Sequence, residues 1–220
     1  HAVGWAMASA YRGDTCISLG MIGEGSTAEG NFHEAMTMAG VYRAPAILAV
    51  SNNQWAISSF SGIATPEATT FASKALAYGI PGLRVDGNDF LAVWAAIDWA
   101  AQRARANKGP TLIEFLTYRA AGHSTSDDPT RYRPDDEASQ WPLGDPVERL
   151  KAHLIECGEW SDERQVQMEA ELAQGLREAQ RAAEAVGTLG KSKPPVSAMF
   201  EDVFAEPDWR VLEQRRELGV

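Results

Sequence analysis

Two short polar motifs, each directly after an apolar run, carry the side chains best suited to bind a metal ion. Gly23-Glu24-Gly25 follows the first run, and Asn52-Asn53 follows the next. Glu24 offers a carboxylate oxygen and Asn53 an amide oxygen, and hard oxygen ligands of this kind suit Mg²⁺. Two or three protein ligands alone would hold the ion weakly, so we expect a diphosphate to share it.

The diphosphate is expected to lie against the turn that follows the first motif. A helix start near residues 28–31 would present free amide groups and the positive end of the helix dipole to an anion. Gly23, Gly25 and Gly30 permit close approach of the backbone. Each motif alone is common turn chemistry. Together they predict one site, because the intervening chain accommodates one helix and one strand and returns to the same sheet edge.

Alternating strands and helices must position these motifs. Short aliphatic runs indicate buried strands, and apolar residues repeating every three or four positions indicate helices. The predicted strands are residues 15–22, 46–50, 83–86 and 111–116, and the predicted helices are residues 31–43, 70–78 and 90–106. This order predicts an α/β domain with a mostly parallel sheet flanked by helices. The chain opens inside an amphipathic helix, so we expect further sequence upstream of His1.

Two long helices carry clear apolar stripes. In residues 90–106 the stripe predicted to face the core is Phe90, Val93, Trp94, Ile97, Ala101 and Ala104. Asn88 or Asp89 can cap the start of this helix. Residues 162–185 form a second long helix with many polar side chains. Its predicted packing stripe is Val166, Ala173, Leu176 and Ala183.

Residues 118–144 lack this periodicity and form a long loop, and loops of such length are usually functional or disordered. His123 lies in this loop beyond the last predicted strand, and an imidazole can donate or accept a proton near neutral pH. We assign residues 1–140 to the metal- and diphosphate-binding domain, and residues 141–220 to a C-terminal helical extension and tail. Within the tail, residues 199–204 form an apolar patch suited to contact with a partner.

Composition excludes several classes of function. The formal net charge is −10 and the pI about 4.9. Such acidity disfavours a nucleic-acid surface, which needs clustered Lys and Arg. The longest apolar runs fall far short of the roughly 20 residues that a membrane span requires. Cys16 and Cys157 have neither metal-ligand spacing nor the density of a disulfide scaffold, so a reducing compartment is expected.

Three blocks of the sequence resemble the α subunit of branched-chain 2-oxo acid dehydrogenases. They are GEGSTAEGNFHEAM at 23–36, SNNQWAIS at 51–58 and YRAAGHSTSDDPTRYR at 118–133. The blocks stand in the order and spacing of that family, and the likeness covers most of the chain. The first two are similar to the thiamine-diphosphate motif in general, whereas the third narrows the family. The resemblance implies the C-terminal part of such a subunit, a thiamine-diphosphate-binding fold, and thiamine diphosphate with Mg²⁺ as cofactors.

The resemblance also assigns roles to individual residues. Glu24, the side chain of Asn53 and the backbone carbonyl of Trp55 would bind Mg²⁺. His123 would be catalytic, moving a proton during decarboxylation. The implied cofactor-binding set comprises Gly23, Glu24, Gly25, Ser26, Asn53, Arg119 and His123.

This chain departs from the family pattern at several positions. Many relatives have Asp where this chain has Glu24, some have Arg in place of Ser51, and Tyr is frequent where Trp55 stands. A longer carboxylate still provides an oxygen, and a backbone ligand tolerates Trp. Ser51 would remove one phosphate contact. In eukaryotic relatives the serine after the histidine is a regulatory phosphorylation site, and here that residue is Ser124.

Two other histidines complete the set of candidate side chains. His33 follows the predicted diphosphate turn, and the sequence favours a packing role and a role in supporting the site equally. His153 is predicted to lie on the surface.

The implied reaction is decarboxylation of a branched-chain 2-oxo acid, followed by transfer of the acyl group to a lipoyl-bearing transacylase. A β subunit would complete the active site in an α₂β₂ assembly, so this chain alone should be inactive. One alternative is a pyruvate or acetoin dehydrogenase α subunit, which residues 124–128 disfavour. Another is a non-catalytic cofactor-binding subunit, against which Glu24, Asn53 and His123 argue. Such subunits are expected in the bacterial cytoplasm or the mitochondrial matrix.

Overall fold

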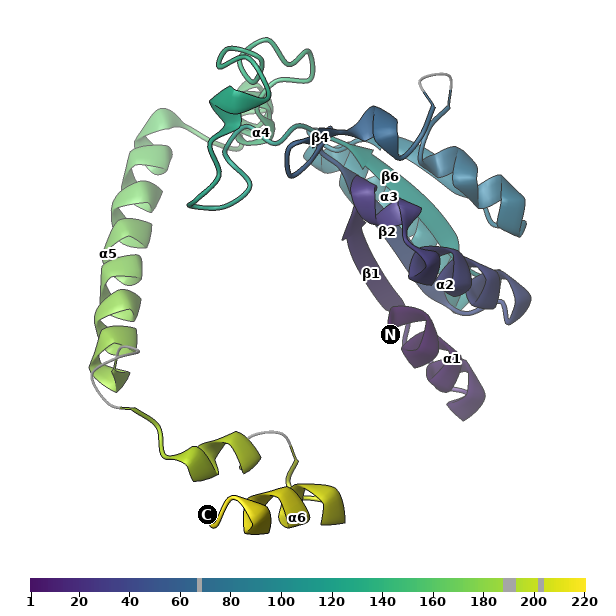
Figure 1. Cartoon of the computed structure of the whole chain (residues 1–220). Helices are drawn as coiled ribbons and strands as arrows, with labels where there is room; N and C mark the ends of the chain where they lie inside the picture. The colour runs from purple at the N-terminus through teal and green to yellow at the C-terminus, as the bar shows by residue number, and fades with distance from the viewer. Residues whose placement is uncertain (67–68, 188–192, 202–203) are drawn as a thin grey trace. The chain divides into compact units, whose positions relative to one another are not determined.

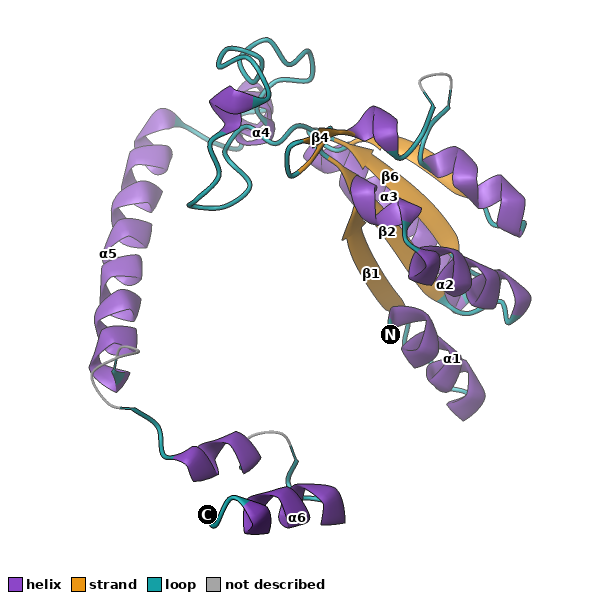
Figure 2. Ribbon diagram, viewed as in Figure 1, coloured by secondary structure: helices purple, strands orange, loops and turns teal. Residues whose placement is uncertain are grey.

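A four-stranded parallel sheet organises the first part of the chain (Figures 1 and 2). The computed structural model describes residues 1–66, 69–187, 193–201 and 204–220. The strands lie in the order β1 (Ser18–Gly23), β2 (Ala46–Asn52), β6 (Thr111–Leu116) and β5 (Gly82–Asp86). Every neighbouring pair is parallel. The predicted α/β fold with a parallel sheet flanked by helices is therefore confirmed.

The strand register explains why the two polar motifs meet. Gly23 pairs with Ser51, and Asn52 pairs with Leu116. Parallel strands end at the same edge of a sheet, so the residues that follow β1, β2 and β6 emerge together. This edge therefore carries the predicted cofactor motifs and the start of the long loop.

Helices cover both faces of the sheet. On one face, α1 (Ala2–Arg12), α2 (Gly30–Val41) and the 3₁₀ helix η3 (Ala72–Tyr78) pack against apolar residues such as Val50 and Leu112. On the other face, α3 (Phe90–Arg105) packs against residues such as Ile47 and Ile113. The central strands are thus buried on both sides, as their continuous apolar runs predict.

The predicted core stripe of α3 is partly wrong. Phe90 is 55% exposed and Trp94 is 63% exposed. Small side chains face the sheet instead, and the buried residues are Ala96, Ala100, Ala101 and Ala104. Alanines let the helix approach the strands closely, whereas two large rings would hold it away. The predicted cap is confirmed, because the Asp89 carboxylate accepts a hydrogen bond from the Ala92 amide at 3.0 Å.

Short elements differ most from the predictions. Residues 70–78, predicted to be helical, form the 3₁₀ helix η3, and the first strand begins at Ser18 rather than at residue 15. A small antiparallel hairpin was not predicted; it pairs β3 (Trp55–Ala56) with β4 (Ser59–Phe60). Three further 3₁₀ turns are η1 (Glu24–Ala28), η2 (Ser61–Ile63) and η4 (Pro129–Arg131).

The chain divides into two compact units, His1–Glu159 and Trp160–Val220. This division falls later than the predicted boundary between residues 140 and 141. Helix α4 (Pro146–Glu156) belongs to the first unit, because Arg149 forms ion pairs with Asp86 at 2.8 Å and Asp89 at 3.5 Å.

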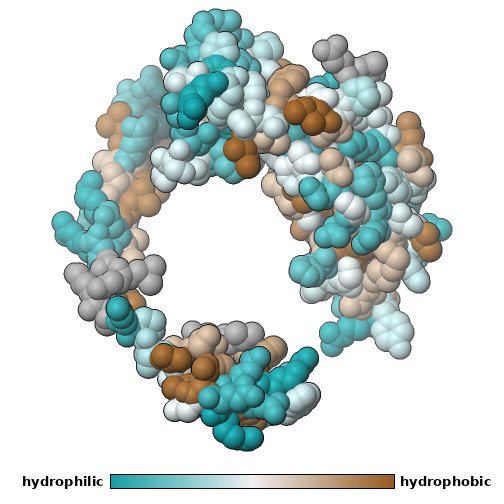
Figure 3. All heavy atoms as spheres, in the orientation of Figure 1, coloured by the Kyte–Doolittle hydropathy of each residue, from teal (hydrophilic) through white to brown (hydrophobic). Residues whose placement is uncertain are grey.

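The second unit consists of α5 (Asp162–Val186), the 3₁₀ helix η5 (Val196–Phe200) and α6 (Trp209–Glu217). None of the residues of α5 is buried within the described chain, and Val166 and Leu176 of its predicted stripe are exposed. Apolar surface is accordingly visible along this helix in Figure 3.

The apolar tail patch predicted at residues 199–204 is only partly covered by the structure. Its positions 202 and 203 lie outside the described residues, while Met199 and Phe204 are exposed. Among the helices that the structure describes, none combines the length and apolar character needed to cross a membrane.

Candidate functional site

A cleft of about 400 Å³ lies at the sheet edge where the polar motifs emerge. It is lined by Gly23, Glu24, Gly25, Ser26, Glu29, Asn53, Trp55, Ala56, Ile57 and His123. Of the predicted site residues, Arg119 is absent from this lining. Residues from η1, from the hairpin after β2 and from the long loop therefore share one cleft, as the strand order requires.

Glu24 is the most buried polar group in this cleft, with 1% of its surface exposed. One carboxylate oxygen, Oε2, accepts a hydrogen bond from the Asn53 backbone amide at 3.3 Å. The other, Oε1, has no hydrogen-bond partner among the described residues. A buried carboxylate oxygen without a partner is costly, so this oxygen fits a cation ligand.

The turn after β2 provides two further oxygen atoms. The Asn53 side-chain oxygen accepts a hydrogen bond from the Trp55 amide at 3.1 Å. The Trp55 carbonyl accepts one from Arg119 Nη1 at 2.9 Å. Gln54, between them, adopts a left-handed backbone with φ 74°. Carboxylate, amide and carbonyl oxygens form a donor set suited to Mg²⁺.

This donor set depends on more than ionisable side chains. The part of the chain that the structure describes holds no group of three or more His, Cys, Asp and Glu side chains placed to bind a metal. A cation held by Glu24, Asn53 and Trp55 would therefore need additional ligands from a bound molecule or water, as the sequence predicts.

Gly25 is required by close contact between η1 and the hairpin. A Cβ atom at this position would lie 2.6 Å from the Cβ atom of Ala56. By contrast, a Cβ atom at Gly23 or Gly30 would meet no protein atom within 4 Å. The turn around η1 thus has room for a side chain at some glycines and not at others.

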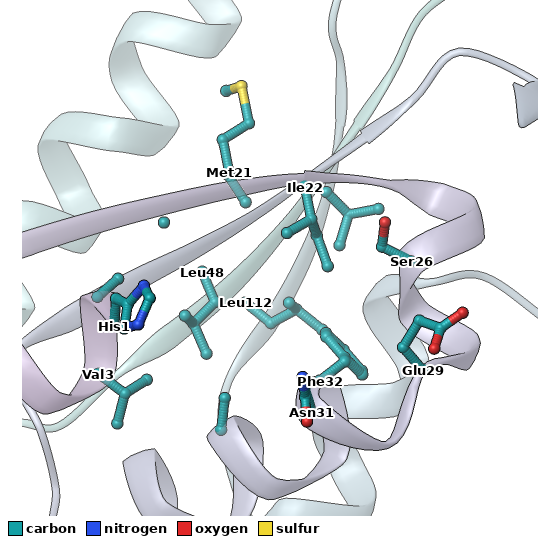
Figure 4. Close-up of a pocket in the computed structure, with 15 residues that line it drawn as sticks. His1, Val3, Met21, Ile22, Ser26, Glu29, Asn31, Phe32, Leu48 and Leu112 are labelled. Atoms are coloured by element: carbon teal, nitrogen blue, oxygen red, sulfur yellow. The ribbon is translucent and has the colours of Figure 1, made fainter. Parts of the chain in front are cut away.

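The turn also contains a residue that sequence reasoning missed. Glu29 stands at the N-cap of α2, and its side chain lines the cleft. Figure 4 draws a neighbouring pocket of about 500 Å³ in which Ser26 and Glu29 lie at one end and His1 and Val3 at the other. An acidic side chain here opposes the attraction of the helix start for an anion. No sequence pattern distinguishes it from a solvent-facing glutamate.

Arg119 joins the loop to the turn after β2 instead of lining the cleft. Besides the Trp55 carbonyl, its guanidinium donates to the Ile57 carbonyl at 2.7 Å and to the Tyr132 hydroxyl at 2.6 Å. It also lies 3.9 Å from Asp127 Oδ2. The guanidinium is therefore held by protein groups in this structure.

His123 lies at the exposed rim of the cleft, in a loop ordered around Asp127. Asp127 Oδ2 accepts hydrogen bonds from the Tyr132 hydroxyl at 2.6 Å and from the His123 backbone amide at 2.7 Å. These two bonds, in that order of size, lower the pKa of the Asp127 carboxyl below its ordinary 3.8. The His123 backbone is thereby fixed at the rim of the cleft that this residue lines.

Arg133 anchors the base of the same loop. It is buried, and it donates hydrogen bonds to the carbonyls of Arg119, Ala120 and Ala121. The many charged side chains of this loop would favour salt bridges as the contacts that order it. Carbonyl and hydroxyl acceptors account for more of its contacts, and neither Tyr132 nor Arg133 was predicted to have a specific role.

The remaining histidines lie elsewhere. His33 Nδ1 lies 2.5 Å from the Tyr78 hydroxyl, which links α2 to η3, and His33 does not line the cleft. Its contact is structural. His153 is exposed on α4, as predicted.

A parallel sheet flanked by helices, with carboxylate, amide and carbonyl oxygens gathered at its carboxyl edge, defines an α/β protein with a candidate cation site. Residues 1–192 match the family described as the dehydrogenase E1 component. The chain belongs to this family, whose members depend on thiamine diphosphate.

Three relatives illustrate the range of similarity. The chain is 57% identical to 2-oxoisovalerate dehydrogenase subunit alpha of Pseudomonas aeruginosa, over 100% of this chain and 54% of that protein. It is 42% identical to 3-methyl-2-oxobutanoate dehydrogenase subunit alpha of Mycobacterium tuberculosis, over 99% of this chain and 58% of that protein. It is 39% identical to pyruvate dehydrogenase E1 component subunit alpha of Acholeplasma laidlawii, over 98% of this chain and 61% of that protein.

The chain thus spans about half the length of the curated relatives it matches. The predicted resemblance to branched-chain 2-oxo acid dehydrogenase α subunits is confirmed. Identity is lower for the pyruvate dehydrogenase relatives.

Proposed function

We propose that this chain forms the cofactor-anchoring part of the α subunit of a thiamine-diphosphate-dependent dehydrogenase that acts on branched-chain 2-oxo acids. The observation that carries the proposal is the buried Glu24 Oε1 atom, which lacks a partner among the described residues, beside the Asn53 turn. Such an oxygen favours a bound cation at this edge of the sheet. The names and identities of the relatives support the class of substrate.

In this proposal, Glu24, the Asn53 side chain and the Trp55 carbonyl hold Mg²⁺. A carbonyl oxygen has two lone pairs, so Trp55 can serve both a metal and Arg119. Gly25 and Ser26 hold the diphosphate through the open side of η1, with Gly23 beside them. Thiamine diphosphate supplies the electron sink for decarboxylation when bound.

His123 is proposed to move the proton. Its backbone is held by the Asp127 carboxylate, and the residue is among those that line the cleft. An imidazole in this position can pass a proton to or from the reacting 2-oxo acid at one of its ring nitrogen atoms. Arg119 orients the Trp55 carbonyl and, by resemblance, contributes positive charge toward the diphosphate.

Two partners belong to the proposal. The relatives are named as α subunits, and one is named as a subunit of an E1 component. We infer that a β subunit completes the active site in an α₂β₂ assembly and that a lipoyl-bearing transacylase accepts the acyl group. The chain alone should then have no turnover.

The site is tested by Glu24→Ala in the full-length α subunit assembled with β. We expect calorimetric titration to detect no Mg²⁺-dependent binding of thiamine diphosphate, because the only carboxylate ligand has been removed. Glu34→Ala, an exposed position on α2 outside the cleft, should bind as the parent does. Unchanged cofactor affinity in Glu24→Ala would refute the metal site.

Pyruvate is the second candidate substrate, favoured by the 39% identity to the Acholeplasma laidlawii relative. Steady-state kinetics of the assembled enzyme should give a higher kcat/KM for 3-methyl-2-oxobutanoate than for pyruvate. A clear preference for pyruvate would replace the substrate while leaving the cofactor site in place.

A further inference from the structure

Glu114 is a carboxylate with no exposed surface in the central strand β6, outside the cofactor cleft. Its Oε1 atom accepts a hydrogen bond from Asn52 Nδ2 at 2.8 Å, and its Oε2 atom accepts one from the Ala72 backbone amide at 2.9 Å. Arg84 Nε lies 3.4 Å from Oε1. A buried carboxylate is costly, so the fully paired geometry indicates a specific role.

The contacts of Glu114 lead to the metal-binding turn through Asn52. While the Asn52 amide group donates to Glu114, its side-chain oxygen accepts hydrogen bonds from Gln54 N at 3.3 Å and Gln54 Nε2 at 3.0 Å. Gln54 adopts a left-handed backbone with φ 74°, as Ile57 does at the end of the same turn with φ 57°. Residues other than glycine rarely adopt this conformation without local hydrogen bonds that favour it.

The left-handed turn controls where two proposed ligands point. Asn53 precedes Gln54 and Trp55 follows it. The Asn53 side-chain oxygen accepts a hydrogen bond from the Trp55 backbone amide at 3.1 Å. A change in the Gln54 backbone would move both the Asn53 side-chain oxygen and the Trp55 carbonyl. Hydrogen bonds that fix this backbone therefore fix the metal geometry.

We propose that Glu114 is a positioning residue for the cation site, acting through Asn52 on the turn formed by residues 52–57. This rests on the proposed function, because the turn is assigned there to Mg²⁺. A carboxylate is required, since both of its oxygens face N–H donors. Glutamine would turn an NH₂ group toward one of these donors and break that contact.

A competing explanation is purely structural. Through the Ala72 amide, Glu114 also joins β6 to η3, and any variant there will lower the stability of the fold. The experiment must therefore separate metal affinity from stability. Ile113 supplies a matched control, because it is equally buried on the same strand but faces α3 on the opposite side of the sheet.

The experiment compares Glu114→Gln, Asn52→Ala and Ile113→Ala in the assembled full-length enzyme. Mg²⁺ is titrated at saturating thiamine diphosphate, well below each variant's Tm. We expect Mg²⁺ affinity to fall about 10- to 100-fold in the first two variants, as for other groups that orient metal ligands. The variant that carries both Glu114→Gln and Asn52→Ala should lose little more Mg²⁺ affinity than either single variant, because both substitutions break the same series of hydrogen bonds. Ile113→Ala should lower Tm with Mg²⁺ affinity unchanged.

A second readout needs neither metal nor turnover. Hydrogen exchange of the metal-free enzyme should be faster at residues 52–57 in Glu114→Gln and Asn52→Ala than in Ile113→Ala. If Glu114→Gln fails to assemble, Asn52→Ala carries the test alone. The proposal is overturned if both variants lower Tm as Ile113→Ala does while Mg²⁺ affinity and local exchange stay unchanged. Failure of the cation site itself is distinguishable, because only then would Glu24→Ala also leave Mg²⁺ affinity intact.

Discussion

The two sides of the proposed cofactor cleft are built by different physical means. On the sheet side, Glu24 is buried in the cleft, and Thr27 and Glu114 are buried outside its lining, with hydrogen bonds fixed by strand register and packing. On the loop side, His123 is exposed, and Asp127 orders its backbone by accepting from surface-accessible groups. The first side is held by buried packing, as a protein core is. The second side is held by hydrogen bonds to an accessible charged group, whose strength depends on salt and pH. Their responses to mutation should therefore differ in kind.

Overpacking the sheet side should have the largest effect. In Gly25→Ala the new Cβ atom would lie 2.6 Å from Ala56 Cβ, so η1 or the hairpin must move. We expect a loss of about 3 kcal/mol in the free energy of unfolding, measured by urea denaturation, and a marked loss of cofactor affinity. Gly30→Ala, which meets no protein atom within 4 Å, is the control. Equal effects of the two variants would show that close packing at Gly25 does not matter.

Removing a partly buried cation that bonds to η1 should have the next largest effect. Lys74 Nζ donates to Thr27 Oγ1 at 2.7 Å and to the Ala64 carbonyl at 3.0 Å, and burial lowers its pKa below 10.5. Lys74→Met leaves these acceptors without a donor. Denaturation should report a loss of about 2 kcal/mol.

Arginine can restore the contacts of Lys74. Lys74→Arg should recover most of the stability that Lys74→Met loses. If Lys74→Met is as stable as the parent, the hydrogen bonds to η1 make no net contribution.

The loop side should respond by local opening rather than by global unfolding. In Asp127→Asn the amide oxygen can still accept from both donors, which share one acceptor atom, but the negative charge that strengthens these bonds is lost. Trypsin cleavage after Arg131 should become several-fold faster, because cleavage follows the population of the open loop. Asn53 and its turn should exchange hydrogen at the parental rate. Accelerated exchange in both places would mean that the two sides are not separate.

The same carboxylate sets the pH dependence of the loop. The hydrogen bonds to Asp127 hold its pKa in the folded protein below 3.8. The stability that this carboxylate gives to the loop is therefore present above pH 3.8 and is lost as the pH falls through the pKa of the folded state. Pepsin cleavage within residues 118–133 should therefore accelerate in this acid range for the parent. The Asp127→Asn variant should lack this acceleration of cleavage at low pH, because it has no carboxylate at that position to protonate.

His33→Ala should have the smallest effect. His33 is exposed and contacts Tyr78 across α2 and η3, away from the cleft. A change within about 0.5 kcal/mol in unfolding free energy is expected, with unaltered affinity for thiamine diphosphate. A loss of affinity for thiamine diphosphate in His33→Ala would show that His33 supports the cofactor site.

The sequence predicted the parallel sheet and the meeting of the two polar motifs at its edge, because long apolar runs and their end residues carry strong signals. Buried polar positions in those runs were missed, although Glu114 is visible as a lone charge inside the apolar segment TLIEFL. The hairpin at residues 55–60 was missed because two-residue strands have no measurable period. Tyr132 and Arg133 were missed as individual contacts, since a loop's partners depend on its path rather than on its composition.

The α3 stripe shows a different limit. Apolar periodicity indicates that a helix is amphipathic, but here the small residues and the large rings lie on different faces. Packing distance decided the orientation: Ala100 and Ala101 face the sheet, while Phe90 and Trp94 face outward.

The exposed apolar face of α3 affects how readily copies of the chain associate with one another. Phe90, Leu91 and Trp94 are exposed neighbours on α3, and contiguous apolar surface of this kind favours association. The net charge of −10 opposes it by repulsion between copies. Salt shortens the range of that repulsion, and acidification toward the pI of about 4.9 removes it. Ionic strength and pH thus set whether this helix face meets water or another molecule.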